Sequence, residues 1–193
     1  MIRVLIVDDH PALRAGVWSM LRVEPGLQPA GAVSGADDAL EHTAAVRPDV
    51  ILVDYRLPGE NGLLLCHRLR ELDDPPQVLM YSGYPEAELA VPALLARANG
   101  VLSKAAPPDT FVDAIRDVAR GRAVFPDIGP ERLQASASRL DVDDLPILGM
   151  LVERTPLPEV AETLGISPDQ LDARLHAMIK RLAPPVHDPV TTT

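Results

Sequence analysis

The first 121 residues alternate between two hydrophobic patterns. Short, nearly continuous apolar runs are separated by longer segments in which apolar positions recur at helical spacing. Strands are expected at residues 2–7, 29–33, 49–54, 77–82 and 100–103, and helices at residues 12–23, 36–46, 62–72, 86–98 and 108–120. Five strands alternating with five helices predict an α/β fold, a doubly wound parallel sheet covered by helices on both faces.

The pattern changes after residue 121. Residues 122–138 mix Gly, Pro and Ser with one short helical patch near residues 130–135, and they predict a linker after a first domain at residues 1–121. Residues 139–184 show helical spacing alone and predict a small all-α domain. The end of the chain, residues 185–193, is expected to be a flexible tail.

A helix-turn-helix is predicted inside the second domain. The segment "PEVAETLGIS" reads as a helix that stops at Gly165, because glycine is the preferred residue just beyond a helix end. Ser167 and Gln170 can form a capping box at the start of the next helix, with Pro168 at its first position.

Polar residues stand where the strands of the first domain end. Asp8 and Asp9 follow the first strand, Asp54 ends the third, Ser82 ends the fourth and Lys104 follows the fifth. Such strand ends meet at one edge of a parallel sheet, where ligands bind. Clustered carboxylates need a cation, and Mg²⁺ with a phosphate suits oxygen ligands. We therefore expect a magnesium and phosphate site, with Asp54 as the carboxylate that attacks phosphorus and Ser82 and Lys104 binding the phosphoryl group.

Charge and composition limit the other functions. The 193 residues carry a net charge of −10, with −6 in residues 1–121 and −4 in residues 122–193, so any contact with DNA must use a local basic patch. Cys66, the only cysteine, is read as a small apolar residue, and the five histidines show no ligand-like spacing, so no zinc site is predicted. With no long apolar run or leader, a cytoplasmic protein without membrane contact is expected.

Four segments, "VLIVDDHPALRAGV", "DVILVDYRLPGENG", "VLMYSGY" and "GVLSK", resemble the receiver domain of bacterial two-component response regulators. The resemblance implies a flavodoxin-like strand order 2-1-3-4-5. It also implies Mg²⁺ bound by Asp8, Asp9 and Asp54, and Asp54 phosphorylated by a sensor histidine kinase. Ser82 would be the switch hydroxyl and Lys104 the contact to the phosphoryl group. Pro58 and Gly59 match the tight turn after the phosphoacceptor.

Two positions depart from the receiver pattern. Val101 stands where the family has an aromatic residue that swings inward on activation, and Tyr84 is the candidate substitute. Pro92 lies inside the fourth helical segment, where a proline removes a hydrogen bond and clashes with the preceding turn. We expect this helix to start near Pro92 or to kink there.

The C-terminal region is similar to the LuxR-type DNA-binding domain of the NarL/FixJ class, in which the second helix of the hairpin enters the major groove. Helical spacing predicts a buried stripe on this helix, made of Leu171, Leu175, Met178, Ile179 and Leu182. The opposite face would carry Asp169, Ala173, His176, Ala177 and Lys180.

Few side chains on this helix suit DNA. Arg174, Lys180 and Arg181 are candidate phosphate contacts, whereas Asp172 stands where the family usually has a lysine and would repel phosphates. We expect DNA binding that is weaker than usual for the class, or that needs a dimer or another protein.

Three functions compete. The first is a phosphorylation-responsive transcription regulator that acts as a homodimer on DNA. The second keeps the receiver chemistry but makes the C-terminal domain a module for protein–protein contacts. The third, an aspartate-nucleophile phosphatase, is disfavoured because such enzymes resemble D-x-D on the first strand, whereas Asp8 and Asp9 are adjacent here. No enzyme activity is therefore expected.

Overall fold

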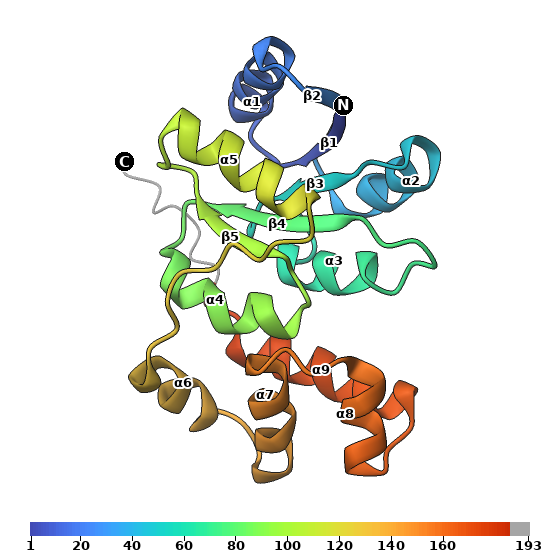
Figure 1. Cartoon of the computed structure of the whole chain (residues 1–193), viewed down its shortest axis with the longest axis vertical. Helices are drawn as coiled ribbons and strands as arrows, with labels where there is room; N and C mark the ends of the chain where they lie inside the picture. The colour runs from blue at the N-terminus through green and yellow to red at the C-terminus, as the bar shows by residue number, and fades with distance from the viewer. Residues whose placement is uncertain (186–193) are drawn as a thin grey trace.

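A computed structural model describes residues 1–185 of the chain. Its centre is a five-stranded, all-parallel sheet in the order β2-β1-β3-β4-β5, which confirms the predicted doubly wound sheet (Figure 1). The strands are β1 (Ile2–Val7), β2 (Leu27–Val33), β3 (Val50–Val53), β4 (Gln77–Ser82) and β5 (Gly100–Ser103). Within the central strands almost every side chain is buried, as expected for a sheet covered on both faces.

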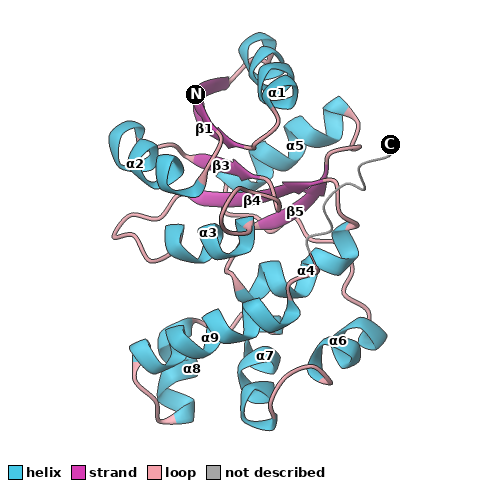
Figure 2. Cartoon of the chain, turned by 180° about the vertical axis from the view of Figure 1, so that it is seen from behind, coloured by secondary structure: helices cyan, strands magenta, loops and turns pink. Residues whose placement is uncertain are grey.

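Helices cover both faces of this sheet (Figure 2). α1 (Pro11–Val23) and α5 (Pro108–Ala119) pack on one face, where Val4 and Ile6 of β1 point. α2 (Ala36–Val46), α3 (Gly62–Leu69) and α4 (Glu86–Leu95) pack on the other, where Leu5 and Val7 point. Within the part of the chain that the structure describes, no helix is long and apolar enough to cross a membrane.

The fourth helix differs from the sequence expectation. α4 begins at Glu86 and continues through Pro92, so the expectation that it starts near Pro92 is wrong. The carbonyl of Pro92 still accepts a hydrogen bond from the backbone N–H of Ala96 at 2.9 Å, so the last turn is intact. The helix ends at Leu95 rather than at residue 98 because Arg97 adopts a left-handed conformation, with φ of 62°. The kink at Pro92 stays a prediction.

All the regular elements of the C-terminal region are helices over the described residues. It holds α6 (Pro130–Ala137), the 3₁₀ helix η1 (Val142–Asp144), α7 (Leu145–Val152), α8 (Leu157–Leu164) and α9 (Pro168–Leu182). The helix-turn-helix of α8 and α9 is as predicted, with Gly165 in the left-handed region at φ of 64°. Ser167 and Gln170 form both bonds of the capping box. The domain boundaries at residues 121, 138 and 184 stay predictions, and residues 186–193 of the expected tail lie outside the described part.

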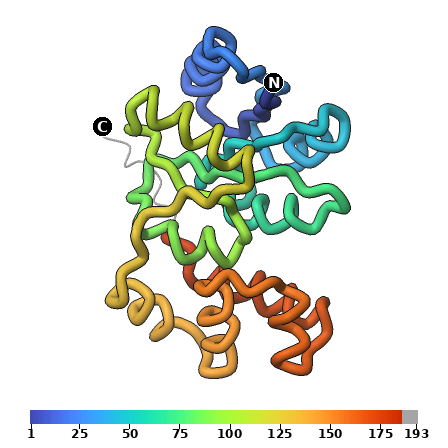
Figure 3. Tube along the Cα trace, viewed as in Figure 1, coloured from blue at the N-terminus to red at the C-terminus, as the bar shows by residue number. Residues whose placement is uncertain are grey.

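α9 packs against the first domain as well as against its own hairpin. The predicted stripe on α9 is buried along its whole length, from Leu171 to Leu182. These residues belong to the same hydrophobic cluster as buried side chains of α3 and α4, and the contacts of α9 reach both helices. Figure 3 shows the red C-terminal helix returning beneath the green α4 segment. One continuous apolar core therefore joins the two parts of the chain.

Candidate functional site

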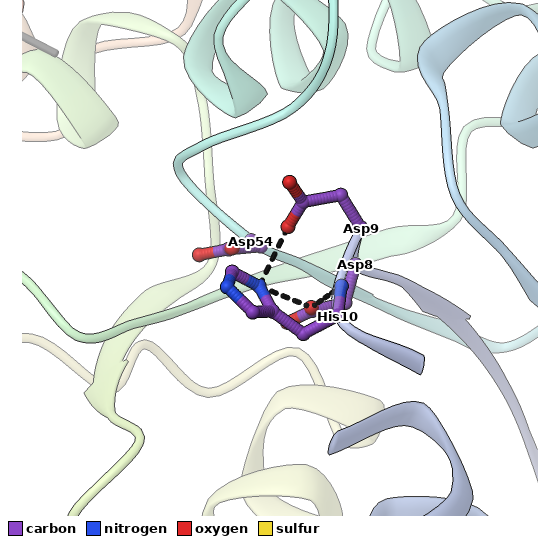
Figure 4. Close-up of side chains that lie close together, drawn as sticks. All are labelled: Asp8, Asp9, His10 and Asp54. Carbon is purple, nitrogen blue, oxygen red and sulfur yellow. Dashed lines mark hydrogen bonds and ion pairs between the residues drawn. The ribbon is translucent and has the colours of Figure 1, made fainter. Parts of the chain in front are cut away.

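The acidic side chains predicted at the sheet edge do meet. β1 and β3 are adjacent and in register, with Val7 opposite Val53, so the next residues, Asp8 and Asp54, lie side by side. Ligand atoms of Asp8, Asp9, His10 and Asp54 all lie within 4.8 Å of one another (Figure 4). The strand order therefore builds an acidic cluster from residues far apart in the sequence.

Lys104 closes this cluster from the end of β5. Its Nζ lies 2.6 Å from Oδ2 of Asp8 and 2.8 Å from Oδ2 of Asp54. Both carboxylates are almost fully buried, with 2% and 4% of their surface exposed. Burial raises the pKa of Asp54, and the hydrogen bond and positive charge of Lys104 counteract part of that rise. One ammonium group does not neutralise three carboxylates, so the cluster can accept a further cation.

The donor atoms fit a hard divalent cation. Among the described residues, Asp8 Oδ2 and Asp9 Oδ1 are buried without a hydrogen-bond partner of good geometry, although Lys104 and His10 are close to them. Carboxylate oxygens grouped in this way are the ligands that Mg²⁺ and Ca²⁺ take in proteins. His10 is an unpredicted member of the cluster, with Nδ1 2.6 Å from Oδ1 of Asp9. Its position directly after Asp9 is the one signal in the sequence that could have indicated it.

A cavity opens beside the acidic cluster. It has a volume of about 640 Å³, and its lining includes Asp54, Ser82 and Lys104, the three residues predicted to handle the phosphoryl group. Oγ of Ser82 is buried and accepts a hydrogen bond from the backbone N–H of Tyr84 at 3.1 Å. The carboxylate, the hydroxyl and the ammonium group therefore face one space that is large enough for a phosphoryl group.

Two glycines shape the loop between Asp54 and α3. Gly59 has a φ of 85°, which side chains rarely adopt, in agreement with the tight turn expected there. At Gly62 a Cβ atom would lie only 2.0 Å from the backbone oxygen of Asp54. α3 can begin against the backbone of Asp54 only because this position has no side chain, a requirement that the sequence pattern alone did not reveal.

Residues next to the site also contact the chain that follows α9. The hydroxyl of Tyr84 donates a hydrogen bond to the carbonyl of Pro185 at 2.6 Å, and the hydroxyl of Tyr55 donates one to the carbonyl of Pro184. The two tyrosine rings pack edge to face, with centroids 5.0 Å apart. Val101 is buried in β5. The neighbours of Asp54 and Ser82 are thus linked directly to the C-terminal end of the described chain.

The candidate DNA contacts on α9 are placed differently from one another. Arg174 pairs with Oδ1 of Asp144 at 2.7 Å, and Arg181 pairs with Oδ2 of Asp141 at 2.7 Å, whereas Lys180 is exposed. Two of the three candidate phosphate contacts, Arg174 and Arg181, are therefore engaged in ion pairs within the chain in this arrangement.

The positions expected on the DNA-facing side of α9 need a correction. Oδ1 of Asp172 lies 2.9 Å from Nε2 of His67 on α3, and the ring of His176 packs beside the ring of His67, with centroids 5.9 Å apart. Both residues therefore face the first domain rather than an open groove. Helical spacing gave the buried stripe of α9, but it could not show that α3 covers a second strip beside it.

Comparisons with known proteins agree with this geometry. The family model of the response regulator receiver domain matches residues 4–116. The chain is 31% identical to the response regulator UvrY of Escherichia coli O6:H1, over 94% of this chain and 88% of that relative. It is 30% identical to the DNA-binding transcriptional activator DevR/DosR of Mycobacterium tuberculosis, over 91% of this chain and 80% of that relative.

A solved structure shares the fold. The crystal structure of a LuxR-family two-component response regulator from Aurantimonas has a TM-score of 0.62 and 28% identity, over 70% of this chain and 97% of that one. Together, the parallel sheet, the matched receiver segment and the relatives that align with nearly the whole chain lead to one assignment. The chain belongs to the response regulator family, in the NarL/FixJ class that joins a receiver to a LuxR-type helix-turn-helix.

Proposed function

We propose that this response regulator accepts a phosphoryl group on Asp54 from a sensor histidine kinase and regulates transcription by binding DNA, as a homodimer, through its helix-turn-helix. The observation that carries the proposal is the meeting of three carboxylates, of Asp8, Asp9 and Asp54, within 4.8 Å, next to the ammonium group of Lys104. The similarity to DevR/DosR, a DNA-binding transcriptional activator, supports the output.

The site residues divide the chemistry. A carboxylate oxygen of Asp54 forms a bond to phosphorus while the P–N bond of the phosphohistidine donor breaks and leaves its electron pair on the imidazole nitrogen. Lys104, 2.8 Å from Asp54, binds an oxygen of the transferred group, and the hydroxyl of Ser82 donates a hydrogen bond to another. Asp8, Asp9 and Asp54 would hold Mg²⁺, whose positive charge offsets the negative charge of the phosphoryl oxygens.

The hydrogen bonds around Tyr84 suggest how phosphorylation reaches α9. Ser82 now accepts a hydrogen bond from the backbone of Tyr84, and Tyr84 in turn donates one to Pro185. When the hydroxyl of Ser82 turns to the phosphoryl group, the loop of Tyr84 moves with it and the contact with Pro185 weakens. This route takes the place of the inward swing of an aromatic residue, which Val101 cannot make. It also loosens the contact between the receiver and the end of α9.

Intact mass tests the phosphorylation. We expect one added phosphoryl group after incubation with Mg²⁺ and a small phosphodonor such as phosphoramidate, and none in Asp54→Asn or in the presence of EDTA. Asp38→Asn, at an exposed carboxylate on α2, is the matched control and should be phosphorylated like the native protein. Equal phosphorylation of Asp54→Asn would refute the role of Asp54.

A salt titration tests the output. We expect the phosphorylated protein to bind its own promoter region at low salt, with an affinity that falls as salt rises. The slope of log affinity against log salt is negative. Lys180→Ala and Arg181→Ala should each make it less steep by about 0.9, the value for one phosphate contact. Arg22→Ala, an exposed arginine on α1, is the control that should leave the slope unchanged. Absence of binding in every state would instead leave protein–protein contacts as the output.

A further inference from the structure

A second cluster of metal-ligating side chains lies between the receiver and α9. Ligand atoms of His67, Glu71 and Asp172 all lie within 4.8 Å of one another. His67 is on α3, Glu71 follows the last turn of α3, and Asp172 is on the facing side of α9. His176, one helical turn after Asp172, packs its ring beside that of His67. α3, the turn after it and α9 thus bring His67, Glu71 and Asp172 together, with the imidazole of His176 beside that of His67.

His67 is the group that makes this cluster unusual. Only 3% of its surface is exposed. Among the described residues, neither ring nitrogen has a hydrogen-bond partner of good geometry, although Nε2 lies only 2.9 Å from Oδ1 of Asp172. Buried polar atoms are normally satisfied, so a buried imidazole without a proper partner that points at a carboxylate calls for a further ligand.

We propose that His67, Asp172 and Glu71, with His176 as the fourth ligand, form a binding site for a divalent transition metal of the Zn²⁺ type. Imidazole and carboxylate together suit Zn²⁺ better than Mg²⁺, which takes oxygen ligands. Ligands at Zn²⁺ bond lengths in tetrahedral geometry are about 3.3 Å apart, so the pair of His67 and Asp172 needs only a small separation. This site is distinct from the acidic cluster at Asp54, which contains no residue of α3 or α9.

The charges around the cluster determine which of its residues are the primary ligands of the metal. Glu71 pairs with Arg97, so an entering cation competes with this guanidinium for one carboxylate. Asp172 has no such competitor among the ion pairs of the described residues, since the one ion pair that it makes there is with His67. His67 and Asp172 are therefore the primary ligands, and the exposed Glu71 and the half-buried His176 complete the coordination.

Metal at this site would hold α9 on the receiver. The primary ligands come from α3 and α9, so the complete site exists only while the two helices are in contact. A ligand that binds one arrangement alone shifts the equilibrium toward it. Bound metal therefore opposes release of α9 and lowers DNA affinity, a consequence that rests on the proposed function, whereas metal binding itself does not.

Cobalt spectroscopy tests the site without DNA or phosphorylation. With millimolar Mg²⁺ present to occupy the acidic cluster, we expect one equivalent of Co²⁺ to give the visible absorption of tetrahedral coordination, and Zn²⁺ to displace it. His67→Ala and Asp172→Asn should each lower the affinity at least tenfold, because even loss of a group behind a metal ligand costs 10- to 100-fold. His42→Ala, at an exposed histidine on α2, is the control and should bind like the native protein.

Two safeguards keep the outcome clear. Asp172 is half-exposed, so Asp172→Asn should fold even if loss of the buried His67 ring does not permit folding, and circular dichroism establishes which variants are native. Unchanged Co²⁺ affinity in a folded Asp172→Asn, or no Co²⁺ binding in the presence of Mg²⁺, would overturn the proposal and leave an ion pair only. If the site binds metal, Zn²⁺ should weaken DNA binding by the native protein and not by Asp172→Asn.

Discussion

Gly62 lies where the first turn of α3 meets the backbone of Asp54, and a Cβ at this position would be 2.0 Å from the oxygen of Asp54. Because neither backbone can move away cheaply, we expect Gly62→Ala to lower the free energy of unfolding by about 1–3 kcal/mol or more. It should also slow phosphorylation of Asp54, since a displacement of about 1 Å at a reacting group can cost about 100-fold. Urea unfolding and the rate of phosphorylation by phosphoramidate measure the two effects.

Gly16 provides the matched control for this prediction. It lies inside α1 with open space around the position of a Cβ atom. Gly16→Ala should therefore raise the free energy of unfolding by about 0.5–1 kcal/mol, the difference in helix propensity, and leave phosphorylation unchanged. Equal destabilisation by the two substitutions would contradict the role of close approach at Gly62.

Cys66 illustrates how burial controls reactivity. Its thiol is buried on α3 and lies 3.3 Å from the carbonyl oxygen of Ala96, and burial raises the pKa of the thiol to about 12. The reactive thiolate is therefore about a thousandfold rarer at pH 8 than in a free cysteine. As long as the pH is below about 12, each increase of one pH unit raises the thiolate fraction about tenfold. We expect iodoacetamide to label the native protein very slowly, and the urea-unfolded protein rapidly. Equal labelling rates would show that the thiol is accessible.

At the scale of elements, the start of α9 depends on one local motif. The side chain of Ser167 accepts a hydrogen bond from the backbone N–H of Gln170, and the side chain of Gln170 accepts one from Ser167. We expect Ser167→Ala to cost about 1 kcal/mol in the free energy of unfolding, measured by urea titration. Ser19→Ala is the control, because Ser19 lies within α1 and its hydroxyl only bonds back to Ala15. That substitution should be neutral or slightly stabilising.

At the scale of the whole molecule, the continuous core predicts that the receiver and the helix-turn-helix unfold together. Leu175 on α9 is fully buried in the cluster that also includes residues of α3 and α4. We expect Leu175→Ala to cost about 2–5 kcal/mol. Trp18, the only tryptophan, reports on α1 in the receiver, so its fluorescence should show the same shift in midpoint as circular dichroism.

An exposed position serves as the control for the joint transition. Val142 is 80% exposed in η1, and Val142→Ala should change the free energy of unfolding by less than about 0.5 kcal/mol. If Leu175→Ala shifted only the circular dichroism and left the midpoint of Trp18 fluorescence in place, the two parts of the chain would be shown to unfold separately.

The sequence by itself determined the layered fold and most of the acidic site. Strands and helices follow from local patterns of apolar residues, and the carboxyl ends of parallel strands meet whatever the details of packing. The strand ends alone therefore predict that one edge of the sheet carries Asp8, Asp9, Asp54, Ser82 and Lys104. The capping box of Ser167 and the buried stripe of α9 are equally local, because each involves neighbours one or two helical turns apart.

Only the tertiary structure decided what α9 contacts and how closely backbones approach. Hydrophobic spacing gives the face that a helix buries, but not which surface covers the strip beside it, so Asp172 and His176 were expected to face DNA and lie against His67 instead. The need for glycine at position 62 arises from a contact with Asp54, eight positions earlier along the chain, that no helical or strand period encodes. Contacts between distant segments depend on how packed elements fit together, and local patterns carry no record of that fit.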